Sequence, residues 1–175
     1  NRVIEAAPAG VEVVDAPIVG GVRYAREKSV TFLLGGSEQV ASKLDPVLSV
    51  MGIIRYVGKS GNGVAYKLIT NVAIMAAEAG LREALDLADE LDMDYELSLD
   101  LMSVGPMAAV VSRALDTSNP RPLRRSAEDD DTLLSAVSDP ERVLPISVAG
   151  RGRLWEAVHA KEGFDPDFVD LTRKT

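Results

Sequence analysis

The chain has 175 residues, 46% of them hydrophobic, and a formal net charge of −8 at pH 7, so it can bury the core of one medium or two small domains. An acidic chain of this kind does not bind nucleic acid by neutralising phosphates. Because cysteine is absent and His159 is the single histidine, disulfides, thiolate chemistry and a His-rich zinc site are excluded. The apolar runs are short and broken by charged residues, and the N-terminus is unlike a signal peptide, so we expect a cytoplasmic protein with no membrane span. We also expect no metal.

Short strand-like runs separated by turns dominate the first 62 residues. Residues 3–7 are typical of a last helical turn, which Pro8 ends. Three strands are predicted, at residues 11–14 (VEVV), 29–34 (SVTFLL) and 53–57 (IIRYV), each followed by proline or glycine. Ser37 caps a predicted helix that ends near residue 49, with a possible restart at Pro46. The strand–helix–strand order indicates a thin α/β layer.

From residue 63 onward the apolar spacing is helical. Apolar residues recur every three or four positions from Val64 to Leu91, which predicts one helix of nearly thirty residues. Further helices are expected at residues 95–102, 106–115, 129–137 and 145–161, with a short one after Asp165 and a loop over residues 117–126. Residues 128–131 (EDDD) are interpreted as an acidic helix start, and the five methionines as core fillers.

The first candidate site is the segment 58–71, GKSGNGVAYKLITN. Its glycine-rich turn leads from a strand into the long helix, where backbone can approach a ligand closely. Lys67 and Asn71 lie four residues apart, on one face of the first helical turns. A lysine beside an amide can hold an oxygen and exchange a proton with it. Taken alone, an exposed lysine on an amphipathic helix is the better interpretation, and the glycine spacing is the reverse of the dinucleotide fingerprint.

The second candidate site is the segment 15–21, DAPIVGG. A glycine pair after a strand can offer the backbone N–H groups of Gly20 and Gly21 to an anion. The alternative interpretation is a plain turn.

Together, these segments resemble the β-hydroxyacid dehydrogenase family, which includes 3-hydroxyisobutyrate dehydrogenases and tartronate semialdehyde reductases. Residues 15–21 are similar to the family motif D-A-P-V-S-G-G, and residues 31–36 to its T-x-M-V-G-G strand. Residues 58–71 fit the catalytic signature G-x-x-G-x-G-x-x-x-K-x-x-x-N. Matching stretches also occur at residues 46–58, 83–85 and 163–168. The order and spacing of the motifs hold over most of the chain.

The resemblance implies the C-terminal portion of such an enzyme, incomplete and inactive alone. The expected fold is mainly α with a small α/β N-terminal part. Residues 1–62 would be the last strands and helix of a Rossmann-like cofactor domain. Residues 63–175 would form an all-helical domain, similar to the C-terminal domain of 6-phosphogluconate dehydrogenase, that opens with the long interdomain helix and serves substrate closure and oligomerisation, in a homodimer or tetramer.

By the same resemblance, the reaction moves a hydride between NAD or NADP and a small 3-hydroxyacid or semialdehyde. Lys67 would be the general acid/base, its pKa lowered by desolvation, and Asn71 would orient the substrate. The substrate carboxylate would lie against Val19, Gly20 and Gly21, and a weaker expectation places the cofactor near Gly61 and Gly63.

The sequence departs from the family pattern in three ways. Val19 stands where the family has a substrate-binding serine, and Tyr24 and Lys28 stand where it has small residues in the following turn. The helical domain's Lys-Asp pair has lost its lysine within residues 128–131, leaving Arg124 and Arg125 as the nearest basic residues. The alternative function is therefore a non-catalytic helical oligomerisation or ligand-binding module derived from the family. An imine reductase is a third, weaker alternative, because Lys67 and Asn71 fit the hydroxyacid enzymes.

Overall fold

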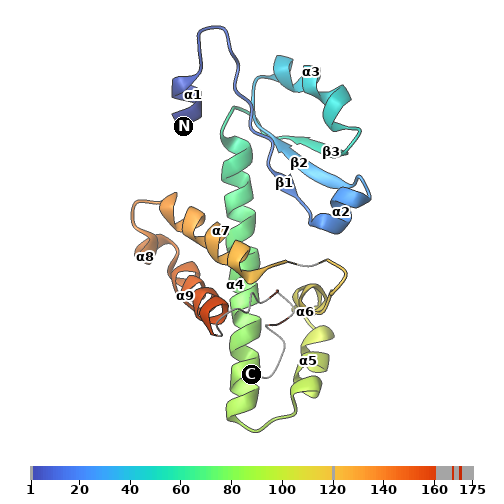
Figure 1. Cartoon of the computed structure of the whole chain (residues 1–175), viewed down its shortest axis with the longest axis vertical. Coiled ribbons are helices and arrows are strands. Elements are labelled where there is room, and N and C mark those ends of the chain that lie inside the picture. Colours follow the sequence, from blue (N-terminus) through green and yellow to red (C-terminus); the bar gives the residue numbers. More distant parts are fainter. Residues whose placement is uncertain (1, 120, 161–166, 168–169, 171–175) are drawn as a thin grey trace. The chain divides into compact units, whose positions relative to one another are not determined.

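The structure, a computed structural model, describes residues 2–119, 121–160, 167 and 170 (Figure 1). The chain divides into two units, Asn1–Thr70 and Asn71–Thr175. This boundary falls inside the long helix α4 (Asn62–Glu90), whereas the sequence predicts it before that helix, at residue 62. The first turns of α4 belong with the sheet because Gly63 lies against the backbone of β2. A Cβ atom on Gly63 would lie 2.2 Å from the Leu33 carbonyl oxygen, so no larger residue fits there.

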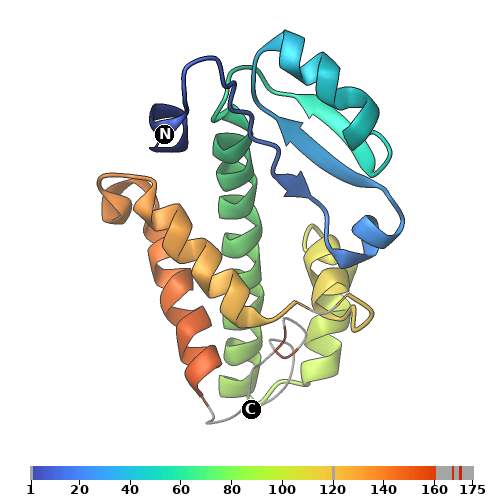
Figure 2. The same cartoon turned by 45° about the horizontal axis from the view of Figure 1, so that its top comes forward.

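The first unit is a three-stranded sheet with short helices around it (Figure 2). Its elements are α1 (Arg2–Ala6), β1 (Ile18–Val19), α2 (Val22–Arg26), β2 (Val30–Leu34), α3 (Glu38–Leu48) and β3 (Gly52–Tyr56). The central strand β2 pairs antiparallel with β1, in the register Ile18 to Phe32, and parallel with β3, in the register Thr31 to Ile53. Alternate residues of β2 are buried, as expected for a strand with one face on a core.

The structure confirms β2, β3 and α3 and corrects the first predicted strand. Residues 11–14 are not a strand, because the chain pairs with β2 only from Asp15 onward, first as an isolated bridge between Asp15 and Gly35. β-rich composition yields a strand only where a partner edge is present. α3 runs through Pro46 without a restart, and the hydroxyl of Ser37 accepts a hydrogen bond from the Val40 N–H at 3.3 Å, as its capping role predicts.

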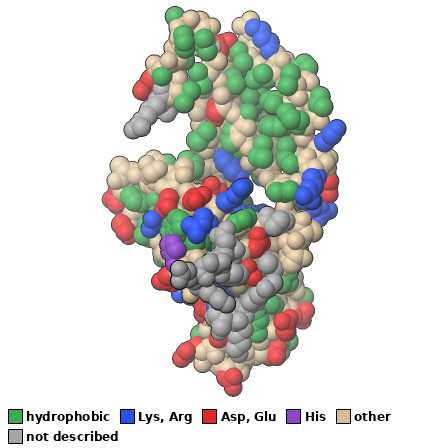
Figure 3. Space-filling view, in the orientation of Figure 1, with side chains coloured by type: hydrophobic (Ala, Val, Ile, Leu, Met, Phe, Trp, Pro, Cys, Tyr) green, Lys and Arg blue, Asp and Glu red, His purple; other side chains and the backbone are tan. Residues whose placement is uncertain are grey.

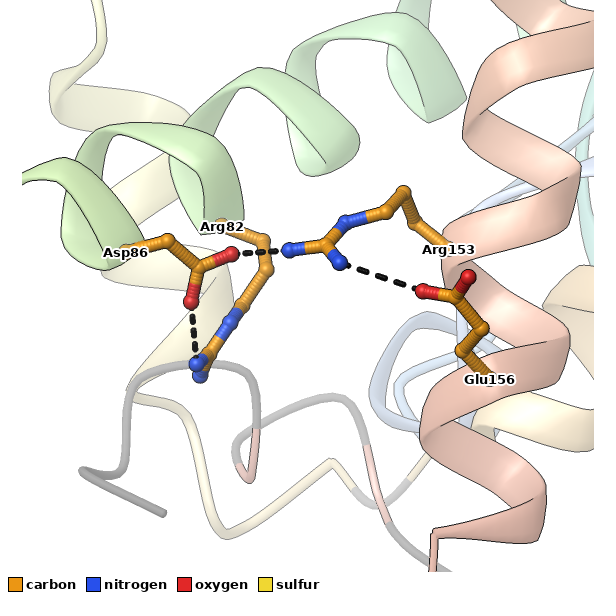
Figure 4. Close-up of polar contacts among 4 residues, drawn as sticks. All are labelled: Arg82, Asp86, Arg153 and Glu156. Carbon is orange, nitrogen blue, oxygen red and sulfur yellow. Dashed lines mark hydrogen bonds and ion pairs between the residues drawn. The ribbon is translucent and has the colours of Figure 1, made fainter.

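The second unit is helical. The rest of α4 shares a core with α5 (Tyr95–Ser103), α6 (Ala108–Ala114), α7 (Leu123–Ser135) and α9 (Pro145–His159), whereas the short α8 (Pro140–Val143) contacts α9. The core consists of nine buried apolar residues, Leu81, Leu85, Leu99, Val111, Ala114, Leu123, Ala127, Leu154 and Val158. Four charged side chains also join α4 to α9 (Figure 4): Arg153 bonds both Asp86 and Glu156, and Asp86 also bonds Arg82.

Three interpretations from the sequence are wrong: the extent of the loop before α7, the acidic helix start, and the methionines as core fillers. α7 begins at Leu123, within the predicted loop, because Leu123 and Ala127 are buried in the core and draw this stretch into a helix. Residues 128–131 are therefore the middle of α7, not its start. Of the five methionines, Met75 is buried, whereas Met51 and Met93 are exposed. The expected helix after Asp165 and the motif at residues 163–168 lie outside the described residues, Asp167 excepted.

The composition of α4 bears on the expectation of no membrane span. In one 18-residue window its mean hydropathy is 1.3 and 17% of the window is buried, so by length and composition α4 is able to cross a membrane. Central helices of water-soluble domains meet the same criterion, and α4 carries the buried carboxyl group of Glu78 bonded to two arginines. The expectation of no membrane span stays a prediction.

Candidate functional site

The carboxylate of Asp15 caps the long helix. The backbone of Asp15 pairs with Gly35 at the end of β2, through bonds of 3.0 and 2.8 Å. Its side chain accepts hydrogen bonds from the Gly61 N–H at 2.6 Å and from the Val64 N–H at 2.7 Å. The first N–H groups of a helix have no partners within the helix, and here Asp15 satisfies two amide groups where α4 begins.

Glycines at two positions make this contact possible. A Cβ atom on Gly63 would lie 2.2 Å from the Leu33 carbonyl oxygen and 2.7 Å from Asp15 Oδ2, and one on Gly35 would lie 2.5 Å from Asp15 Oδ1. Within the turn, Gly61 has a φ of +91°, which favours glycine. The glycine-rich turn therefore packs against the protein itself, and neither the Gly61 N–H nor the Cα face of Gly63 is open to a ligand phosphate.

Lys67 lies one helical turn beyond Val64, and Asn71 one turn further along the same continuous helix. The Lys67 side chain is partly exposed, whereas Asn71 is 7% exposed. Lys67 belongs to the first unit and Asn71 to the second. The predicted pair thus stands on one helix face, with its lysine in the stretch whose start Asp15 fixes.

Val19, Gly20 and Gly21 lie at the end of β1 and just before α2. Gly20 has a φ of +120°, and a Cβ atom there would lie 3.1 Å from the Cβ of Tyr24. Among the described residues, no backbone acceptor takes the N–H of Gly20 or Gly21, so both donors can face a ligand. The apolar Val19 side chain adds no donor to them.

A buried polar cluster in the second unit was not predicted from the sequence. Glu78 Oε1 accepts from Arg113 Nε at 3.2 Å and from Arg121 Nη1 at 3.3 Å, while the Glu78 side chain is 1% exposed. Asp130 on α7 is fully buried, and neither of its carboxyl oxygens has a partner. The detectable signal was spacing, because Asn71, Met75, Glu78 and Leu85 occupy the positions of one buried helix face.

Burial shifts both acids of this cluster. Desolvation raises the pKa of Glu78 to about 7, against the lowering effect of the Arg121 charge. The pKa of Asp130 is also raised to about 7, first by desolvation and then by the negative charge of Glu78. Both pKa values thus lie well above the ordinary range of a carboxyl group, Glu78 in spite of its arginine partners.

A separate cavity of about 510 Å³ lies in the first unit. It is lined by residues of α3 and of strands β2 and β3, namely Leu34, Glu38, Ala41, Ser42, Asp45, Ile54 and Tyr56. It contains none of the predicted site residues.

Known structures share this fold. A 3-hydroxyisobutyrate dehydrogenase of Mycobacterium tuberculosis, solved with L-serine, matches with a TM-score of 0.71 and 20% identity, over 91% of this chain and 59% of its own. A 3-hydroxyisobutyrate dehydrogenase of Salmonella typhimurium matches with a TM-score of 0.70 and 20% identity, over 92% of this chain and 59% of its own. In sequence, residues 1–58 match the NAD binding domain of 6-phosphogluconate dehydrogenase. The fold is thus that of the 3-hydroxyacid dehydrogenases.

Curated relatives carry the same indication at higher identity. The 2-(hydroxymethyl)glutarate dehydrogenase of Eubacterium barkeri is 43% identical over 98 residues, 55% of this chain and 33% of its own length. The mitochondrial 3-hydroxyisobutyrate dehydrogenase of Bos taurus is 32% identical over 114 residues, 65% of this chain and 33% of its own. The chain is therefore similar in sequence to β-hydroxyacid dehydrogenases. It spans about a third of the length of these curated relatives.

Proposed function

We propose that this chain supplies the proton-transfer part of an NAD(P)-dependent oxidoreductase that acts on a small 3-hydroxyacid or the corresponding semialdehyde. Lys67 is its general acid/base. The observation that carries the proposal is the position of Lys67, one turn beyond a helix start that is held against the sheet by two hydrogen bonds to Asp15. Such anchoring supports precise placement of a proton-transferring amine.

In this proposal the residues divide the work by their chemistry. The Lys67 amine takes the proton of the substrate hydroxyl during oxidation and returns it to the carbonyl oxygen during reduction. The Asn71 amide orients that oxygen. The N–H groups of Gly20 and Gly21 bind the substrate carboxylate, and Val19 packs beside it without a hydrogen bond. The nicotinamide supplies the acceptor or donor of the hydride.

The comparisons support NAD or NADP as the cofactor of the family. Cofactor binding near Gly61 and Gly63 stays a prediction. A phosphate contact there is disfavoured, because Asp15 accepts a hydrogen bond from the Gly61 N–H and the Leu33 carbonyl oxygen crowds Gly63. We therefore assign proton transfer and substrate binding to this chain, and no cofactor phosphate to the glycine-rich turn.

The experiment that tests the function is an oxidation assay on the protein that carries these 175 residues. A panel of small 3-hydroxyacids is offered with NAD⁺ and with NADP⁺, to the unsubstituted protein and to Lys67→Ala. We expect Lys67→Ala to lose roughly 10²- to 10⁴-fold in kcat. Lys43→Ala, which changes an exposed lysine on α3, is the matched control and keeps its rate. Full turnover by Lys67→Ala would remove Lys67 from the reaction.

The second candidate function is a non-catalytic oligomerisation or ligand-binding module derived from the family, and Val19 favours it because one carboxylate donor is lost. A fluorescence titration of NADH and NADPH against the 175-residue chain helps to separate the two. Sub-millimolar binding would show that copies of the chain rebuild a cofactor site, and would justify a substrate screen. We expect no binding to the chain alone, which agrees with the incomplete enzyme.

We further propose a homodimer or tetramer. Figure 3 shows hydrophobic side chains gathered over the sheet-bearing first unit. Exposed apolar residues of that unit include Val47, Val50 and Ile53. The second unit exposes Leu87 on α4 and Leu97 and Leu101 on α5. Apolar surface of this kind marks protein interfaces. Light scattering at micromolar concentration tests the proposal, and a monomer would contradict it. A cytoplasmic location stays a prediction.

A further inference from the structure

The Asp15 side chain accepts two hydrogen bonds where the long helix begins. Its two carboxylate oxygens are divided between two amides, Oδ1 taking the Gly61 N–H and Oδ2 taking the Val64 N–H. Its backbone is fixed at the same time by the two bonds to Gly35. The end of strand β2 and the start of helix α4 are thereby joined through one residue.

We infer that Asp15 is a positioning residue for Lys67, fixing the start and rotation of the helix that carries the lysine and placing a negative charge at that helix end. The inference rests on the proposed function of Lys67 as the general acid/base. It assigns to Asp15 no contact with the substrate.

The geometric part of the argument follows from helix dimensions. Lys67 is three residues beyond Val64, a rise of about 4.5 Å and nearly one full turn. Anchoring the Val64 amide therefore leaves little freedom in where the Lys67 Cα lies or which way its side chain leaves the helix. The Gly61 bond fixes the turn before the helix, so slippage of the helix start by one residue would break both bonds.

The electrostatic part concerns the charge of the lysine. The N-terminal end of a helix carries a partial positive charge, which disfavours a protonated amine in the first two turns, where Lys67 stands. The Asp15 carboxylate lies at that end and offsets the unfavourable field. Removing its charge, while keeping its shape, makes the Lys67 ammonium give up its proton at lower pH.

A second capping aspartate in the chain provides the matched control. Asp94 Oδ1 accepts a hydrogen bond from the Leu97 N–H at 2.7 Å at the start of α5, the same chemistry at a similar distance. Asp94 belongs to the second unit and to a helix without Lys67. Asp94→Asn therefore reports what the loss of an aspartate cap does in general.

The test is an NMR titration of the 175-residue chain, with its six lysines labelled by ¹³C reductive methylation and the Lys67 signal assigned by Lys67→Arg. In Asp15→Asn we expect the Lys67 signal to titrate at lower pH, with the other five lysines unmoved. We also expect hydrogen exchange at Gly61 and Val64 to quicken about tenfold, the loss of one ordinary hydrogen bond. We expect Asp94→Asn to change neither the Lys67 titration nor the hydrogen exchange at Gly61 and Val64. An unmoved Lys67 titration in folded Asp15→Asn would overturn the inference.

If Asp15→Asn does not fold, the unsubstituted chain carries the test. The amide protons of Gly61 and Val64 should then shift with the same pH midpoint as the Asp15 carboxyl carbon, while the Val40 amide, capped by Ser37, does not follow it. A different midpoint overturns the inference. None of these readouts needs substrate, so a failure of Lys67 in catalysis and a failure of Asp15 to position it are separate results.

Discussion

Two aspartates, one in each unit, show how differently the same side chain is used. Asp15 in the first unit has both carboxylate oxygens bonded to backbone amides where α4 begins. Asp130 in the second unit is fully buried, and neither oxygen has a partner. Bonding to N–H donors favours a charged carboxylate, and burial without partners disfavours it. Asp15 accordingly joins the end of a strand to the start of a helix, whereas burial raises the pKa of Asp130 to about 7.

The largest expected effect comes from crowding the Asp15 contact. In Gly63→Ala the added methyl meets the Leu33 carbonyl and the Asp15 carboxylate, so the backbone must shift. We expect a loss of about 3 kcal/mol or more in the free energy of unfolding. Gly80→Ala, on the same helix with nothing within 4 Å of the new atom, is the control and should stabilise the chain by up to about 1 kcal/mol. Equal effects from the two variants, measured by urea unfolding, would refute the contact.

The pH dependence of stability tests the other aspartate. The pKa of Asp130 rises from 3.8 to about 7 in the folded chain, so the folded state holds a proton that the unfolded state releases. The contribution of Asp130 to stability is therefore fully present below about pH 4 and is lost as the pH rises through 7. Asp130→Asn should flatten this slope and be the more stable protein at pH 8. Asp131→Asn, at an exposed residue paired with Arg151, should keep the slope. A slope unchanged in Asp130→Asn would contradict the buried proton.

Glu78 should show a pH dependence of the same sense. Its pKa rises from 4.5 to about 7 in the folded chain although Arg113 and Arg121 bond it, so at pH 5 the folded state holds a proton that the unfolded state releases. This stabilising contribution is lost as the pH rises through 7, so Glu78→Gln, which stays neutral, should cost about 2 kcal/mol more at pH 5 than at pH 8. Glu83→Gln, on the exposed side of the same helix, is the control at both pH values. An equal cost for Glu78→Gln at pH 5 and pH 8 would show that Glu78 stays charged.

The smallest effect is expected at the network of Figure 4. Arg153 bonds Asp86 and Glu156 with side chains that are 43%, 31% and 69% exposed. Exposed ion pairs contribute little, so Arg153→Ala should cost about 0.5 kcal/mol, and less in 1 M salt. Arg142→Ala, whose side chain is 79% exposed and pairs with Asp139, serves as a reference. A loss above about 2 kcal/mol would mean that the network holds α9 in place.

Local signals in the sequence predicted much of the fold. Ser37 caps a helix where its position suggests, and the apolar spacing predicts the long helix to within two residues at each end. The prediction of a strand at residues 11–14 was wrong because a strand needs a partner edge, and local composition does not reveal one. The predicted start of α7 was wrong as well. The sequence around Leu123, with a proline before it and two arginines after it, is typical of a loop, but burial of Leu123 and Ala127 in the core favours a helix.

The candidate site was likewise predictable only in part. The motifs in the sequence named Lys67, Asn71 and the glycine pair. The roles of these residues stay predictions. The use of Asp15 as a cap could not be predicted from local sequence. It depends on hydrogen bonds to two amides that lie 46 and 49 positions further along the chain. The same long-range contact explains why Gly61 and Gly63 face the protein, contrary to a local interpretation of a glycine-rich turn.

The central claim is that the Lys67 amine moves the proton, and chemical rescue tests it most directly. In the protein that carries these residues, Lys67→Ala is assayed with a 3-hydroxyacid in the presence of increasing concentrations of small primary amines. The account predicts that the amines restore part of the lost turnover, more strongly with more basic amines, and leave Lys43→Ala unaffected. Full turnover by Lys67→Ala without any amine would contradict the claim.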